Sequence, residues 1–143
     1  MSSDAERIAF DTEMISGFTT TPLRFGSISE DDRITTEDNL WMNCNLIPGE
    51  SFAGSIGTSA SYIKKRLGMY EVTVWDREEN GFADILRKLD EIENLFIGRS
   101  LNSGNTVITR TRTMPMSSYN GWSGKQITIS YLASEQVSRT PIL

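Results

Sequence analysis

The residue types that usually carry out acid–base and metal chemistry are almost absent from this chain. Its 143 residues include no histidine, and Cys44 is the only cysteine. Histidine is the commonest general base near neutral pH, the usual partner of a serine or cysteine nucleophile, and the commonest metal ligand. One cysteine without histidine is also too few ligands for a zinc site within one chain. We therefore expect no enzyme activity, no cofactor and no bound metal.

Two acidic clusters and one glycine-rich segment are the remaining candidates for ligand chemistry. The acids at 30–32 and 37–38 lack the spacing of a calcium loop, so solvated loop acids are the default interpretation. Residues 49–61 hold three glycines and four serines but no Walker lysine, and a strand is predicted where a phosphate loop needs a helix. This segment reads better as a flexible arm or an interface loop than as a phosphate site.

Apolar and basic side chains lie in and after that segment. Phe52 and Ile56 either tuck into the core of their own domain or anchor a partner. Lys64, Lys65 and Arg66 supply three positive charges, which would contribute only a small, salt-dependent free energy to nucleic-acid binding. A solvated strand end or a contact with an acidic neighbour is the better interpretation.

Two further groups have both a structural and a binding interpretation. Arg110 and Arg112 share one strand face and can pair with acids on the adjacent strand or on another subunit. Trp41, Trp75 and Trp122 could stack a sugar or a base. Because Trp41 and Trp75 fall within strand alternation, packing against the sheet's second layer is favoured for them.

Two helices must position these residues. Residues 4–17 show one helical stripe and residues 80–97 a stronger one; the stripes are Ala5, Ile8, Ala9, Thr12 and Ile15, and Phe82, Ile85, Leu86, Leu89, Ile92 and Phe96. Residues 20–26 read as a short extended segment and 27–38 as an acidic surface loop.

Strand alternation accounts for most of the remaining chain. The predicted strands are 40–47, ended by Pro48 and Gly49, then 62–76, and a hairpin of 105–113 with 125–133 across a loop at 114–124. Residues 134–143 read as a C-terminal tail. The predicted fold class is α+β, one domain over residues 1–143, with a mostly antiparallel four- to five-stranded sheet and two helices packed on one face.

Charge is unevenly distributed along the chain. The net charge is −5, with −6 in residues 1–40 and +4 in residues 98–143. Such asymmetry suits complementary faces between neighbours, although acidic segments also simply stay solvated. Tight duplex binding is not expected without a dense basic surface. We also expect no membrane span and no signal peptide, and the single cysteine fits a reducing cytoplasm.

The order of motifs over Leu40 to Ala133 resembles a known family. It consists of LIPGE at 46–50, the Gly/Ser segment, RLGMYEVTVWD at 66–76, the helix at 80–97, GRSL at 98–101 and GWSGKQITISYLA at 121–133. This order is similar to that of the tail-terminator (tail completion) proteins of long-tailed bacteriophages, typified by the U protein of phage lambda. No single motif among them is chemically diagnostic; the resemblance lies in order and spacing.

The resemblance implies a structural virion protein of the tail or neck, assembled in the host cytoplasm. Such subunits form a homo-hexameric ring that caps the tail tube, ends tail polymerisation and offers an interface to the head connector. The implied partners are further copies, the tail tube protein and a head-completion or connector protein, while DNA passes through an acidic lumen without specific binding. Candidate interface residues lie in the 49–61 segment and the flanking strands: Glu50, Phe52, Ile56, Tyr62, Lys64, Lys65, Arg66, Arg110 and Arg112.

Two alternatives remain open at this point. One is a different ring-forming neck or tail-tube component of a virion. The other is a small ligand-binding or enzymatic α+β domain, against which the lack of histidine counts. Ring formation separates the structural interpretations from the third, since a ligand-binding domain has no need to form a ring.

Overall fold

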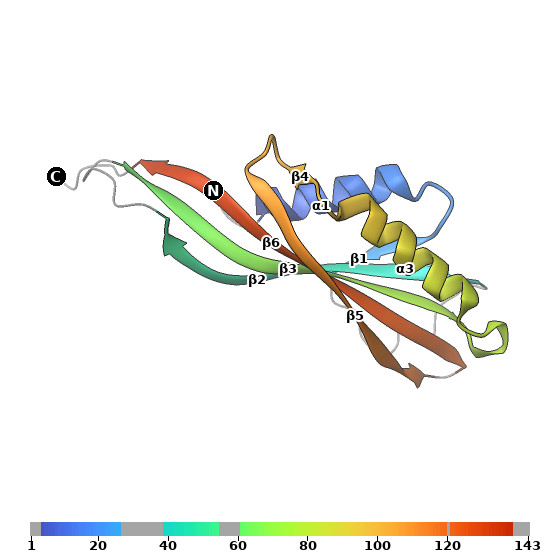
Figure 1. Cartoon of the computed structure of the whole chain (residues 1–143). Helices are drawn as coiled ribbons and strands as arrows, with labels where there is room; N and C mark the ends of the chain where they lie inside the picture. The colour runs from blue at the N-terminus through green and yellow to red at the C-terminus, as the bar shows by residue number, and fades with distance from the viewer. Residues whose placement is uncertain (1–3, 27–38, 55–60, 120, 139–143) are drawn as a thin grey trace.

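A computed structural model describes residues 4–26, 39–54, 61–119 and 121–138 of the chain. Within these ranges it forms two α-helices, a short 3-10 helix (η1) and six strands (Figure 1). In chain order they are α1 (Asp4–Gly17), β1 (Leu23–Phe25), β2 (Trp41–Ala53), β3 (Ser61–Arg77), η1 (Glu78–Asn80), α3 (Ala83–Phe96), β4 (Ser100–Leu101), β5 (Thr106–Tyr119) and β6 (Trp122–Ser138).

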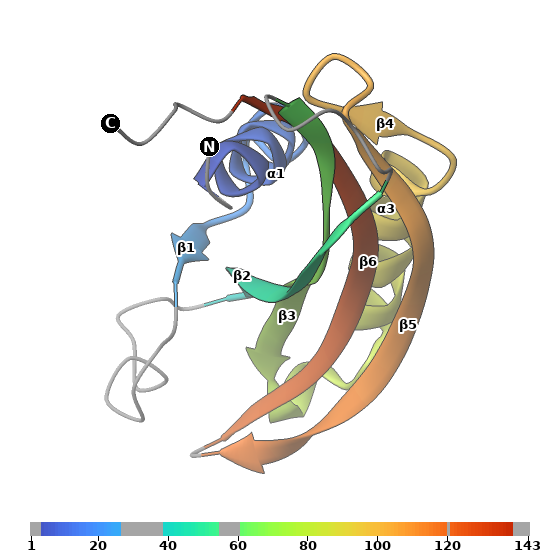
Figure 2. The same cartoon turned by 90° about the vertical axis from the view of Figure 1, so that its left-hand side faces the viewer.

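All six strands belong to one sheet, in the order β1-β2-β3-β6-β5-β4. β1 runs parallel to β2, with Leu23 opposite Met42 and Phe25 opposite Cys44, whereas the other neighbours are antiparallel. Figure 2 shows this mixed sheet curling into a half-barrel. The curl follows from the right-handed twist that accumulates along long strands.

The predicted sheet of four or five mostly antiparallel strands is therefore wrong, although the α+β class holds. The extended segment at 20–26 contributes β1, whose partner strand begins at Trp41, far along the chain. Ser100 and Leu101, in the predicted turn after the second helix, pair with Val107 and Thr106 as β4. Strands of two or three residues are too short to show alternation, so the pattern could not reveal them.

The predicted strand end at Pro48 and Gly49 is a bulge instead. The register between β2 and β3 shifts between Pro48 and Ser51. A Cβ on Gly49 would lie 2.5 Å from the carbonyl oxygen of Leu67, so this close backbone approach requires glycine. Proline is tolerated because β1 covers the edge of β2 only as far as Cys44, which leaves Pro48 on an open edge.

Three strands, β2, β5 and β6, extend further than predicted. β2 continues to Ala53 and β3 begins at Ser61, so the predicted loop 49–61 is strand at both of its ends; residues 55–60 lie outside the described residues. Similarly, β5 and β6 include nearly all of the predicted loop 114–124, and β6 includes residues 134–138 of the predicted tail. Residues 47–53, 61–69 and 130–138 thus form a three-stranded extension, here called the arm, whose tip reaches beyond both helices (Figure 1).

The hydrophobic core lies between the sheet and the two helices. The ring of Phe10 on α1 stacks on Tyr70 of β3 at 4.6 Å between centroids and also contacts Phe96 of α3 at 5.4 Å. Both helices therefore cover the same face of the sheet. Val72 and Ile129 lie on this face and are fully buried.

The first helix is where the sequence predicts it, but it buries a different face. Glu6, Phe10 and Met14 point into the protein, whereas Ile8 and Ile15 of the predicted stripe are 51% and 55% exposed. Two considerations explain the rotation. The aromatic ring of Phe10 removes more apolar area from water than the predicted Ala and Thr positions would, and Glu6 has a buried cationic partner that the helix pattern alone cannot reveal.

The second helix is predicted more accurately. Ile85, Leu89, Ile92 and Phe96 are buried as expected, while Leu86 stays 50% exposed. A helix lying on a curved sheet buries only the centre of a wide apolar stripe, so the residues at the stripe's margin remain in solvent. Leu89 and Leu86 are therefore a matched pair for mutagenesis, because they are the same residue type on the same helix and only Leu89 is buried.

We predict that Leu89→Ala lowers the free energy of unfolding by about 2–5 kcal/mol, because it leaves a cavity beneath α3. The control Leu86→Ala should change it by less than about 1 kcal/mol. Urea denaturation followed by circular dichroism measures both. Equal losses for the two variants would contradict the packing described for α3.

Candidate functional site

The structure brings four of the predicted interface residues to one face of the sheet, the face opposite the helices, here called the outer face. Phe52 lies opposite Lys65 in the β2–β3 register, and Arg110 and Arg112 lie opposite Ser130 and Thr128 of β6. Residues paired across strands share a face, and all four alternate with residues that point toward the helices. Arg110 and Arg112 are exposed.

The other predicted interface residues lie elsewhere. Tyr62, Lys64 and Arg66 point to the helix side of the sheet, as do their partners on β6. Glu50 is exposed at the bulge of β2, and Ile56 falls outside the described residues. The predicted basic cluster is thus split by strand alternation, with Lys65 on the outer face and its two neighbours on the other.

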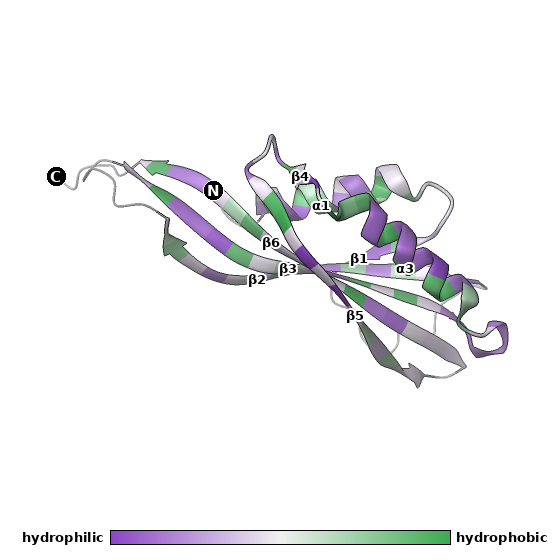
Figure 3. Ribbon diagram, viewed as in Figure 1, coloured by the Kyte–Doolittle hydropathy of each residue, from purple (hydrophilic) through white to green (hydrophobic). Residues whose placement is uncertain are grey.

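An apolar patch that the sequence analysis missed surrounds Phe52 on the outer face. Leu67, Leu132 and Val107 lie side by side across three strands, and Met69 with Ile47 forms the next row. We call these five residues together with Phe52 the sheet patch. Phe52, Leu67, Met69 and Val107 are 44%, 37%, 40% and 46% exposed. Hydropathy colouring of the arm shows the same apolar bands between hydrophilic ones (Figure 3).

Contiguous exposed apolar surface of this kind marks a site of interaction more often than scattered single residues do. The patch also contains a hollow of about 310 Å³, lined by Ile47, Leu67, Met69, Thr109 and Arg110 among others. The sequence offers one sign of this patch: apolar residues point to both faces of the same strand, with Leu67 and Met69 on one face and Tyr70 on the other.

Arg66 serves the fold rather than a partner. Its guanidinium donates to Glu6 of α1, with Nε to Oε1 at 2.7 Å, and to Glu135 of β6, with Nη1 to Oε1 at 2.9 Å. Arg66 and Glu6 are 7% and 0% exposed. Burial alone would lower the pKa of Arg66, but its hydrogen bonds to the two carboxylates raise the pKa above its usual value. This ion cluster ties the start of α1 to the arm.

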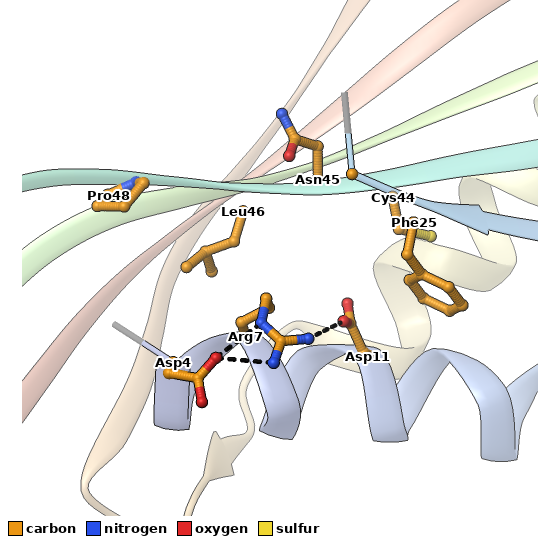
Figure 4. A pocket seen from close by; sticks show the side chains of 9 residues that line it. Asp4, Arg7, Asp11, Phe25, Cys44, Asn45, Leu46 and Pro48 are labelled. Carbon is orange, nitrogen blue, oxygen red and sulfur yellow. Dashed lines mark hydrogen bonds and ion pairs between the residues drawn. The ribbon is translucent and has the colours of Figure 1, made fainter. Parts of the chain in front are cut away.

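A second hollow, of about 500 Å³, opens between α1 and the edge of β2 (Figure 4). Its polar wall is one network on α1: Arg7 binds Asp4 at 2.7 Å and Asp11 at 3.4 Å. Asp11 also accepts a 2.6 Å hydrogen bond from the hydroxyl of Tyr70. The apolar wall comes from residues around Leu46 on the strands. Two carboxylates share one guanidinium, so each acid has a partner while the network keeps one negative charge.

Cys44 lines that hollow, and its thiol is unreactive at neutral pH. Burial and, to a smaller extent, the nearby Asp11 carboxylate raise the pKa of the Cys44 thiol to about 12, although a hydrogen bond with Tyr70 acts in the opposite direction. The thiolate is the reactive form of cysteine, so almost none is present at neutral pH. Among the described residues, this hollow therefore offers no activated thiol to a bound molecule.

The three tryptophans pack on one another. Trp41 stacks on Trp75 at 6.2 Å between centroids, and Trp122 meets Trp41 edge-on at 6.3 Å. All three are buried, with Arg77 over the ring of Trp122. The rings are therefore packed, but against each other on the outer face, so the predicted packing against a second layer is wrong.

Metal and membrane features can be judged only for part of the chain. In the described ranges no group of three or more cysteine or acidic side chains is arranged to hold a metal ion. The acidic clusters at 30–32 and 37–38 lie outside those ranges. No helix among the described residues is long and apolar enough to cross a membrane.

We predict that Arg66→Met lowers the free energy of unfolding by about 3–5 kcal/mol, because it leaves two carboxylates near each other, one fully buried. Lys64→Met, on the same face of the same strand, is the control and should cost less than about 1 kcal/mol. Thermal and urea unfolding measure both. A neutral Arg66→Met variant would mean that the ion cluster does not stabilise the fold.

We also predict slow alkylation of Cys44 by iodoacetamide. At pH 8 the rate in the native protein should be about a thousandfold below that of the denatured chain, and it should rise about tenfold per pH unit while the fold persists, because only the thiolate reacts. Mass spectrometry follows the modification. Fast alkylation of the folded protein at pH 8 would show an accessible, activated thiol.

No protein-family model matches this chain, and no curated protein does. Among solved structures, a protein whose name states no function matches 99% of this chain and 99% of its own length, with a TM-score of 0.65 and 16% identity. A chain from the virion of a native gene transfer agent particle matches 90% of this chain and 92% of its own length, with a TM-score of 0.49 and 9% identity. At these identities the likeness concerns the fold alone.

Proposed function

We propose that this protein is a non-catalytic virion subunit that forms a closed ring and terminates a phage tail. The observation that carries the proposal is the sheet patch: six apolar side chains on four strands, on a face that no helix of the described residues covers. A stable monomer gains nothing from such a surface, whereas an oligomer buries it. The order of sequence motifs that resembles tail-terminator proteins supports the same role.

Charge supports self-association through unlike surfaces. The helix layer is acidic: α1 carries four acids and one arginine, and α3 carries four acids and two bases. The outer face carries Lys65, Arg110 and Arg112 around the sheet patch. Small subunits with two complementary surfaces form closed rings when the rotation between copies closes. We propose six copies, as the family resemblance implies.

In this proposal the ring caps the end of a tail tube, stops its growth and offers its other side to a head-completion or connector protein. Its partners are further copies of the chain, the tube protein and the connector. DNA passes through the lumen, where acidic surface would repel the phosphate backbone and prevent tight binding. A different ring-forming neck component would use the same surfaces, and the partner captured by the ring distinguishes the two.

One observation favours a second candidate function, the binding of a small ligand. The hollow of about 500 Å³ between α1 and β2 is within the size range of small-molecule sites. Its wall combines apolar groups from Phe25 and Leu46 with the charged network of Arg7. A monomer that binds a metabolite in this hollow would favour that candidate over the ring.

The test is size-exclusion chromatography with light scattering, together with negative-stain electron microscopy. We predict closed rings for the native chain, at high concentration or on the ends of tail tubes. Leu67→Ser/Met69→Ser should raise the concentration needed for half-assembly at least tenfold, a loss of about 1.4 kcal/mol or more, because both side chains lie in the sheet patch.

The matched control is Ile8→Ser/Ile15→Ser, which removes two apolar side chains from α1. These are 51% and 55% exposed, against 37% and 40% for Leu67 and Met69. This control should assemble as the native chain does, and both variants should unfold at similar temperatures. A native chain that stays monomeric under all these conditions would exclude the ring, and with it the proposed function.

A further inference from the structure

A second exposed apolar surface lies on the opposite side of the molecule, at the start of α3. Phe82 and Leu86 are 46% and 50% exposed. Beside them is a hollow of about 240 Å³ between α3 and β5, lined by Leu86, Leu89, Asp90 and Pro115 among others. One cation, Lys125 of β6, also lines it, with its ammonium 4.7 Å from the centre of the Phe82 ring. We call Phe82, Leu86, Asp90 and this hollow the α3 surface.

The α3 surface carries a carboxylate without a cation. Asp84 pairs with Arg87 at 2.8 Å and Glu91 with Lys88 at 3.1 Å, so the other exposed acids on this side of the helix are neutralised locally. Asp90 is exposed and has no ion pair or hydrogen bond with the part of the chain that the structure describes. It stands at the rim of the hollow.

The sheet patch has the complementary arrangement. Arg110 lines the hollow of the patch, and Arg112 lies two residues further along β5 on the same face. Both are exposed, and neither has an ion pair within the described residues. One side of the protein therefore offers a hollow in which Asp90 has no ion pair and Lys125 lies over Phe82, and the other an apolar patch with two arginines that have no ion pair within the described residues.

We propose that in the ring the sheet patch of one copy packs against the α3 surface of the next copy, with Arg110 or Arg112 facing Asp90. This rests on the proposed function, because it names the two surfaces through which the ring closes. The partner is a second copy of this chain. The contact joins different surfaces of the two copies, so it repeats head to tail around the ring.

Other pairings of the same surfaces fit less well. Two sheet patches placed against each other would bring the arginines of both copies together, and like charges at an interface oppose binding. The other exposed apolar stripe, around Ile8 and Ile15, has no unpaired acid: Arg7 binds Asp4 and Asp11, and Arg99 binds Glu13 at 3.2 Å. Only the α3 surface offers both an apolar hollow and a free carboxylate within the described residues.

The test uses full-length variants that each block one surface. Arg110→Glu/Arg112→Glu blocks the sheet patch and leaves the α3 surface intact. Leu86→Arg/Asp90→Arg blocks the α3 surface and leaves the sheet patch intact. All four side chains are exposed, so both variants should unfold at the temperature of the native chain. Each alone should need at least about tenfold more protein to form rings.

Mixing the two variants gives the decisive result. Each retains one native surface, and the two altered surfaces carry opposite charges, so an equimolar mixture should recover rings in which the two variants alternate, detectable by native mass spectrometry. A chain with Arg110→Asp, Arg112→Asp and Asp90→Arg exchanges the charges within one molecule, and it should recover rings at a concentration within about tenfold of the native chain.

The outcomes separate this inference from the proposed function. Native rings that both blocking variants still form, a mixture that assembles no better than either variant alone, or an exchanged chain that stays monomeric would each overturn the pairing of these two surfaces and leave the ring in place. A native chain that forms no ring at any concentration or on tail tubes would overturn both.

Discussion

The register between β3 and β6 is the constraint on which the rest of the structure depends. Seventeen consecutive pairs join the two strands, from Ser61 with Ser138 to Arg77 with Trp122, without a shift. Two of these pairs place a glycine opposite a large ring. A Cβ on Gly68 would collide with the hydroxyl of Tyr131, and a Cβ on Gly124 would lie 2.7 Å from the ring of Trp75. A slip of one residue would drive each ring into a side chain and turn every residue to the other face.

This register decides what each face of the sheet can do. The residues of β3 that alternate in step with Tyr70 point toward the helices and form the core. Those in step with Met69 form the outer face. Arg66 and Lys65 are neighbours in the chain, yet one is buried between two carboxylates and the other borders the sheet patch. A buried arginine is tolerated only because both partners reach it, one from α1 and one from the same sheet. The same cluster also holds the first helix against the base of the arm.

The assembly role that we propose draws on the distribution of polar groups. In the hollow beside α1 Arg7 pairs with Asp4 and Asp11, Tyr70 also donates to Asp11, and burial keeps the thiol of Cys44 protonated. Paired and buried groups of this kind stabilise a fold. Unpaired charge lies instead beside exposed apolar surface, at Arg110 on one side and at Asp90 on the other. Apolar area contributes affinity at an interface, and the charges select the partner and its orientation.

The sequence by itself determined the elements whose patterns are local: both helices, the strands of the long hairpin, and the α+β class. The burial of Trp41 and Trp75 and the buried residues Ile85 and Leu89 of α3 also followed from periodicity. Phe52, Lys65, Arg110 and Arg112 were predicted as interface residues from separate parts of the sequence, and only pairing between distant strands showed that they share a face.

Only the tertiary structure decided the mixed six-stranded sheet, the inward face of α1 and the burial of Arg66, because each depends on a partner more than 15 residues away. Glu6 reads as a solvated acid until Arg66 is beside it, and Pro48 reads as a strand end until an open edge and a bulge accommodate it. Hydrophobic periodicity reports what a segment can bury. Which of its faces is buried depends on the surface that the rest of the chain brings to it.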